Sequence, residues 1–182
     1  MTGLAATPAA RPSSLLPRLG LRFALGYAGI AAGLFLIYGF PWELFGARRD
    51  WLSGYLAAYA HLAGAVLHWF DATVVVTGAR IDGRFSLEIA RNCDAIEVNI
   101  LFASAVLAFP TGILRRLVGL IGGLALLVLA NVARICVLYF IGVHCPNWFA
   151  LAHEEVLPLA LVVSAALIFL RFARPQVDAV GS

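Results

Sequence analysis

Long apolar runs constrain the fold of this chain more than any other feature. A helix needs about 20 predominantly apolar residues to cross a bilayer, and five segments approach or reach that length: 22–40, 51–70, 95–109, 117–142 and 156–172. Of the 182 residues, 62% are hydrophobic and only 13% are charged, whereas soluble domains are about a quarter charged. The sequence therefore predicts an all-α integral membrane protein, a multi-pass helical bundle.

Residues 71–92 interrupt the apolar pattern between the second and third runs. They contain consecutive β-branched residues, then Gly78, an Asp82-Gly83 turn signal and an alternating stretch. This pattern predicts a small extracytoplasmic β-hairpin. Residues 22–174 are expected to form one membrane domain, and residues 1–21 and 175–182 are expected to be flexible cytoplasmic tails.

Arginine residues give the expected topology, because they favour the cytoplasmic ends of spans. They cluster before the first run, between the third and fourth runs at Arg115 and Arg116, and after the last run. The hairpin and residues 143–153 then lie on the opposite face. A crossing by residues 51–70 would break this pattern. That segment, rich in Trp, Tyr and His, is expected to be an interfacial or re-entrant helix beside about four spans.

Polar residues concentrate around Cys93, directly ahead of the third run. Asp94 and Glu97 follow it within the stretch "EIARNCDAIEVNI". A thiolate is stabilised at a helix N-terminus or beside a guanidinium, so Cys93 is a candidate nucleophile. The alternative is a small packing residue, as membrane cysteines often are. Cys93 could also pair with Cys145 in an oxidising compartment.

Arg134 lies inside the fourth apolar run, where an arginine costs roughly 2.5–3.5 kcal/mol on insertion scales. Such residues usually face a protein interior or a wet cavity and are functional. Asn131, three residues earlier, shares its helical face, so the two form a polar notch. The alternative is a structural role for Arg134 as the counter-ion of Asp94, Glu97 or Glu154.

His153, in "LAHEEVLPLA", provides the candidate general acid or base. An imidazole ordinarily titrates near neutrality, and Cys–His pairs with an oriented third group catalyse acyl transfer on many folds. Arg134 would be that third group. It could hold the thiolate, stabilise an oxyanion or fix the substrate, and the sequence leaves all three open. Cys136 points to another helical face and is interpreted as a packing residue.

These residues resemble the exosortase/archaeosortase family. The resemblance rests on Cys93 before a span, "NVARI" around Arg134 and "LAHE" at His153, and covers roughly residues 83–171. The stretch "FASAVLAFP" followed by "RRLVGLIGGLALLVLANVARICVLYFIG" is most similar to the short exosortase H class. One departure concerns the cysteine motif. Family members commonly have glycine two residues after the cysteine, where this chain has Ala95.

The resemblance implies a multi-pass cysteine transpeptidase of the bacterial inner membrane with its active site on the periplasmic face. Cys93, Arg134 and His153 would be catalytic, with no metal or other cofactor. Its partners would be C-terminal sorting tails, made of a short motif resembling IPTLxxWG, a transmembrane helix and a basic end, and no nucleic acid. Asn131, Asp94, Glu97 and Glu154 are expected to bind substrate or support the site.

Two other functions fit the same residues. One is a non-catalytic membrane subunit or small transporter in which Arg134 is a structural or substrate-pairing charge. The other is a thiol enzyme that acts on lipid or acyl groups.

Overall fold

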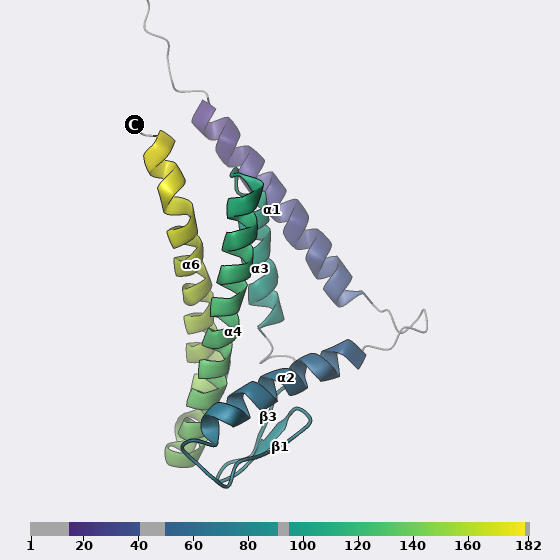
Figure 1. Cartoon of the computed structure of the whole chain (residues 1–182), viewed down its shortest axis with the longest axis vertical. Helices are drawn as coiled ribbons and strands as arrows, with labels where there is room; N and C mark the ends of the chain where they lie inside the picture. The colour runs from purple at the N-terminus through teal and green to yellow at the C-terminus, as the bar shows by residue number, and fades with distance from the viewer. Residues whose placement is uncertain (1–14, 41–49, 91–94, 181–182) are drawn as a thin grey trace, which may run out of the picture.

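The computed structural model describes residues 15–40, 50–90 and 95–180 of the chain (Figure 1). Helices dominate it. In chain order the elements are α1 (Leu15–Gly39), α2 (Asp50–Leu67), β1 (Val75–Thr77), β2 (Arg80–Asp82), β3 (Leu87–Glu88), α3 (Ile96–Ala108), α4 (Ile113–His144), a 3₁₀ turn (Pro146–Trp148), α5 (Phe149–Leu151), a π-helical turn (Ala152–Val156) and α6 (Leu157–Val180). The predicted all-α membrane fold with a small β element is thereby confirmed.

Three segments among the described residues are long and apolar enough to cross a membrane: Gly20–Gly39, Ile113–His144 and Pro146–Arg174. The middle one is α4, of which 44% of the most apolar window is buried, against 6% for the other two. Helix α4 is therefore the central helix of the bundle. Its 32 residues extend about 48 Å, which exceeds the hydrocarbon core of about 30 Å, so its last turns can emerge and carry other elements.

Helix α3 is shorter than the span predicted at residues 95–109. Its 13 residues rise about 20 Å, less than the thickness of the hydrocarbon core. Pro110 follows the helix and the chain reverses before α4 begins at Ile113. Helix α3 packs against α1, α4 and α6, so it forms an internal wall shared by three longer helices.

The start of α4 and the end of α6 lie at one end of the bundle. Arg115 Nη2 donates a hydrogen bond of 2.7 Å to the backbone carbonyl of Phe172. The rings of Phe23 on α1 and Phe169 on α6 are 6.2 Å apart near the same end. Figure 1 shows the sheet at the opposite end. This arrangement agrees with the grouping of arginine clusters on one side of the membrane.

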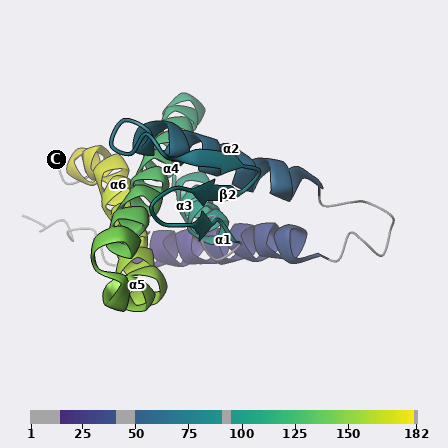
Figure 2. The same ribbon diagram turned by 90° about the horizontal axis from the view of Figure 1, so that it is seen from below.

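Helix α2 lies across the sheet-bearing end of the bundle rather than alongside α4 and α6 (Figures 1 and 2). One face, formed by Tyr59, Ala60, Ala63 and Leu67, is buried in a cluster that includes residues of α4. The other face exposes apolar side chains, among them Leu62 and Val66, and Trp69 and Phe70 are exposed just after the helix. A helix that is buried on one face and apolar on the other suits the membrane interface.

The predicted hairpin is present and has a third strand. Strands β1 and β2 pair antiparallel with Thr77 opposite Arg80, so the connecting turn is Gly78-Ala79. Gly78 has φ 60°, a conformation that glycine adopts without steric cost. The Asp82-Gly83 signal belongs instead to the longer connection between β2 and β3, which pair with Ile81 opposite Leu87. The result is a three-stranded antiparallel meander.

A buried hydrogen-bond network attaches this region to α4. Tyr139 donates its hydroxyl proton to Asp71 Oδ2 at 2.6 Å and accepts a hydrogen bond of 2.9 Å from the backbone N–H of Arg84. The hydroxyl and backbone N–H of Thr73 donate to Asp71 Oδ1 at 2.6 and 3.0 Å. The hydrogen bonds from Thr73 and Tyr139 lower the pKa of Asp71 to about 2. The carboxylate thereby joins the segment after α2, the sheet and α4.

Two helix boundaries differ from the predicted domain limits. Helix α1 begins at Leu15, within the segment expected to be an N-terminal tail, and α6 continues to Val180, within the segment expected to be a C-terminal tail. The apolar runs locate the membrane-crossing parts but not the helix ends, because a helix can continue into water once its membrane segment is anchored by packing.

Candidate active site

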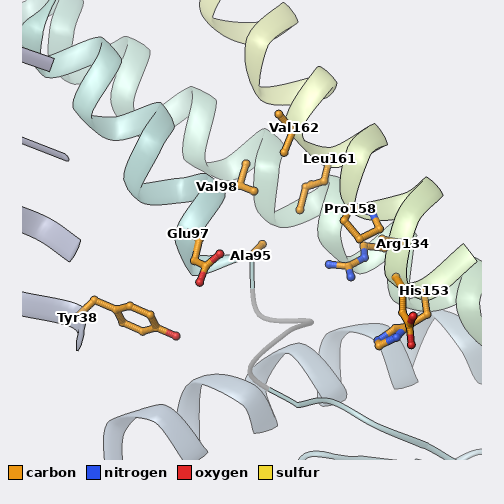
Figure 3. A pocket seen from close by; sticks show the side chains of 10 residues that line it. Tyr38, Ala95, Glu97, Val98, Arg134, His153, Pro158, Leu161 and Val162 are labelled. Carbon is orange, nitrogen blue, oxygen red and sulfur yellow. The ribbon is translucent and has the colours of Figure 1, made fainter. Parts of the chain in front are cut away.

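A cavity of about 560 Å³ lies among α1, α3, α4 and the start of α6. Figure 3 shows it from close by. Its walls combine charged and apolar side chains. The lining residues are Tyr38, Ala95, Glu97, Val98, Arg134, His153, Glu154, Pro158, Leu161 and Val162. Polar residues from α3, α4 and the π-helical turn before α6 converge in it.

Arg134 enters the cavity from α4. It precedes the last residue of that helix, His144, by ten positions, or about 15 Å along the axis. Only 6% of its surface is exposed, and Asn131, one turn earlier, is fully buried. Helical periodicity places the two on one face. The polar notch predicted from the sequence is therefore a buried feature of the central helix.

His153 reaches the cavity from the π-helical turn Ala152–Val156. A π turn inserts an extra residue into a helix, and such turns occur frequently at functional sites. The imidazole is half-buried. It stacks on the ring of Phe149, with centroids 5.7 Å apart and planes inclined by 9°. This stacking fixes the plane of the ring at the cavity wall.

The sheet supports that stack from behind. The ring of Phe85, in the connection between β2 and β3, lies 5.2 Å from the ring of Phe149. Phe85 also packs on α4 at Gly142, where an added Cβ would lie 2.5 Å from the ring. Any larger residue at Gly142 would displace Phe85. A continuous contact thus runs from α4 through the sheet to the histidine.

The N-terminal end of α3 forms another wall of the cavity. Ala95, the residue that caps α3, is buried and has φ 59° and ψ 9°, the left-handed conformation that non-glycine residues rarely adopt. Glu97 and Val98 follow it in the first turn and also line the cavity. The N-terminus of a helix carries a partial positive charge of roughly half a unit. The cavity therefore lies between this helix end and the Arg134 guanidinium.

Four of the predicted site residues come together here: Arg134, His153, Glu97 and Glu154. Asn131 is buried one turn from Arg134. Cys93 and Asp94 lie outside the described residues, immediately before Ala95 in the sequence.

The other cysteines lie away from the cavity. Cys136 is buried in the cluster between α2 and α4, with its sulfur 3.9 Å from the carbonyl oxygen of Ala63. This contact supports its interpretation as a packing residue. Cys145 is an exposed cysteine after α4, and Cys93, the partner considered for it, lies outside the described residues. Neither residue lines the cavity.

Several lining residues have no signal in the sequence. Tyr38 extends into the cavity from the end of α1 (Figure 3). Pro158, Leu161 and Val162 contribute an apolar wall from α6. Each occurs in an apolar run where similar residues face lipid, so only the packing of the helices distinguishes them. Within ranges 15–40, 50–90 and 95–180, no group of three or more His, Cys, Asp or Glu side chains is placed to hold a metal ion.

Comparison with known proteins identifies the family. Residues 3–170 match the family model described as transmembrane exosortase (Exosortase_EpsH). Neither a search of curated proteins nor a search of solved structures gave a match. The matched segment covers nearly the whole chain and includes every helix that lines the cavity. This chain therefore belongs to the transmembrane exosortase family.

Proposed function

We propose that the protein is a membrane-embedded cysteine transpeptidase that cleaves C-terminal sorting tails of exported proteins and transfers them toward the cell surface. Cys93 is the nucleophile, Arg134 provides positive charge at the reacting atoms, and His153 is the general acid and base. The observation that carries this proposal is the shared cavity of Arg134 and His153, bounded by Ala95.

Sequence proximity connects Cys93 with this cavity. Cys93 precedes the lining residue Ala95 by two positions. Two residues of chain span at most about 7 Å in any conformation. This limit, combined with the family membership, supports Cys93 as the nucleophile over Cys136, which is buried on the other side of α4.

The electrostatics of the cavity favour a thiolate. The N-terminal end of α3 and the guanidinium of Arg134 both contribute positive potential. A thiolate near a helix N-terminus or an arginine is stabilised relative to the thiol. The cavity is partly enclosed by apolar side chains of α6, which strengthens electrostatic interactions by excluding water.

The proposed reaction has two acyl-transfer steps. The Cys93 thiolate attacks the scissile carbonyl carbon, and the negative charge moves to the carbonyl oxygen near Arg134. His153 gives a proton to the leaving amine, the C–N bond breaks and a thioester remains. An acceptor nucleophile then attacks the thioester, His153 takes its proton, and the thiolate leaves. The acyl group thus passes from the amine to Cys93 and then to the acceptor, and the thiolate and His153 return to their starting protonation states.

The remaining polar residues are proposed to support this chemistry. Asn131, buried beside Arg134, restricts the guanidinium. Glu97 and Glu154 are exposed at the cavity wall and are proposed to contact the substrate, as is Asp94. The family resemblance implies a bacterial inner membrane location, and the arginine distribution supports an orientation with the cavity on the periplasmic face.

A processing assay in cells tests the proposal. The protein is co-expressed with a reporter that ends in a short motif, an apolar helix and several arginines. Cys93→Ala is expected to accumulate in the membrane and leave the reporter uncleaved. Cys136→Ala and Cys145→Ala are the matched controls and are expected to retain cleavage. If Cys93→Ala processes the reporter at the wild-type rate, the proposed function is wrong.

A further inference from the structure

A second hollow continues from the active-site cavity toward the arginine-bearing end of the bundle. It measures about 210 Å³ and lies among α1, α3 and α6. Its lining residues are Tyr27, Val98, Leu101, Phe102, Ala105, Val162, Ala165, Ala166 and Phe169. Val98 and Val162 also line the active-site cavity, and Figure 3 shows these two side chains near one another on α3 and α6. The two hollows therefore adjoin at Val98 and Val162, and together they are called the groove.

The groove changes character along its length. The active-site part contains Arg134, His153 and Glu97, whereas the extension is lined by aliphatic and aromatic side chains with Tyr27 as its one polar member among the described residues. Small residues, Ala105 and Ala166 among them, occupy its walls. In membranes, where the hydrophobic effect does not drive helix association, small residues allow helices to approach closely and pack.

The groove opens between α1 and α6. These helices meet at the arginine-bearing end, where the rings of Phe23 and Phe169 stack at 6.2 Å and Phe109 contacts both. Figure 1 shows α1 diverging from α6 toward the sheet-bearing end. The floor between them is α3, which packs on both. Leu101 on α3 and Ala166 on α6 line the groove and are exposed, so a segment within the bilayer can reach it sideways.

We propose that the apolar transmembrane helix of the substrate's sorting tail docks in this groove, between α1 and α6 and against α3. This inference rests on the proposed function, because it assigns a place to the segment that follows the scissile bond. The site and the apolar hollow adjoin at the shared residues Val98 and Val162. If the cleavage motif of a peptide occupies the Arg134 end, the residues that follow it, which are those of the helix, lie along the apolar extension.

Another hollow offers a direct alternative. It lies between α4 and α6, measures about 290 Å³, and also touches Arg134. Its other lining residues are Ala130, Ala133, Val137, Leu157, Ala160, Leu161 and Ser164. It lacks His153 and the start of α3. A helix docked there would approach the guanidinium without reaching the histidine.

Two alanines of α6 give a matched pair of variants. Both Ala166, in the proposed groove, and Ala160, in the alternative hollow, are exposed. Ala166→Trp fills the proposed groove and is expected to reduce reporter cleavage at least about tenfold, equivalent to about 1.4 kcal/mol. Ala160→Trp is expected to cleave at the wild-type rate. The opposite result, with Ala160→Trp impaired and Ala166→Trp active, would overturn the proposal.

Photo-crosslinking separates docking from catalysis. Benzoylphenylalanine replaces Leu101 in the groove, or Val137 in the alternative hollow, in a His153→Ala background with the same tail-bearing reporter. Crosslinks to the reporter are expected at Leu101 and not at Val137. Cleavage by the wild type without crosslinks at Leu101 would mean that lipid fills the groove, which refutes docking and keeps the proposed function. Crosslinks at Leu101 without any wild-type cleavage would support docking and refute the proposed function.

Discussion

Arg134, from the middle of α4, and His153, from the π-helical turn that precedes α6, line the same cavity. Figure 3 shows the two side chains on adjacent parts of its wall. One is a guanidinium and the other an imidazole, the side chain that most often transfers protons in enzymes. Their combination beside the start of α3 supports the proposed thiol-dependent acyl transfer.

Arg134→Lys is expected to insert and fold but to cleave the tail reporter about 10²–10³-fold more slowly. Lysine keeps the charge but loses the planar five-donor fork that can contact a thiolate or oxyanion and a neighbouring group together. The measurement is the cleavage rate at equal amounts of membrane-inserted protein. Near-normal turnover would make Arg134 a structural counter-ion.

His153→Ala is expected to slow cleavage by about 10²–10⁴-fold, because a positioned general acid or base contributes about that factor. The pH–rate profile of the variant is expected to lose one of the limbs that the wild type shows. His144→Ala is the matched control, since His144 is an exposed histidine that stacks on Phe140 outside the cavity. If His153→Ala keeps the wild-type pH–rate profile, His153 has a structural role in the cavity wall and is not the general acid or base.

Ala95→Gly is expected to stabilise the protein. The left-handed conformation of Ala95 costs a non-glycine residue about 1–2 kcal/mol. Glycine removes this cost but loses more backbone entropy on folding, which lowers the stability by about 0.5–1 kcal/mol. The net gain should be several tenths of a kcal/mol or more, read as a higher midpoint of thermal unfolding in detergent. Ala103→Gly, inside α3, is the control and should lower the midpoint.

Tyr139→Phe is expected to loosen the sheet from α4, because it removes the hydroxyl that joins Asp71 and Arg84. The lowered pKa of Asp71 means that its contribution to stability is present above the ordinary value of 3.8 and is lost as pH falls toward about 2. Without Tyr139 as donor that pKa rises toward 3.8, so the contribution of Asp71 at neutral pH should be smaller and its loss should be complete at a higher pH. The measurement is the rate at which an acid-stable protease cuts within residues 71–90 of the wild type and of Tyr139→Phe, from pH 5 to pH 2. Identical cleavage patterns in both proteins would contradict it.

The sequence predicted the positions of the central features through simple periodicities. Arg134 and Asn131 could be assigned to one buried face because helical spacing is fixed, and the cost of an arginine in a span indicated a cavity. The buried face could be predicted because it depends on local geometry, and the cavity because it depends on transfer energies. The interfacial location of α2 stays a prediction from charge placement, since a crossing would put the arginine clusters on opposite sides.

Other features depend on packing and had no sequence signal. Tyr38 lines the cavity because of the way α1 packs against the other helices. The π-helical turn at His153 depends on which backbone carbonyls accept the local hydrogen bonds. Ala95 is the instructive case. Glycine is common at this position in the family that the sequence resembles. The left-handed backbone of Ala95 gives a physical reason, because glycine adopts positive φ without steric cost. Ala95 therefore has a strained backbone conformation at the wall of the cavity.

The central claim is that Cys93 forms a covalent intermediate in the cavity of Arg134 and His153. The most direct measurement is mass spectrometry of the protein after acid quenching during turnover with the tail-bearing reporter. The account predicts a thioester that joins the new C-terminus of the reporter to the peptide containing Cys93, absent from Cys93→Ala. Adducts on Cys136 or Cys145, or cleavage that continues in Cys93→Ala, would contradict it.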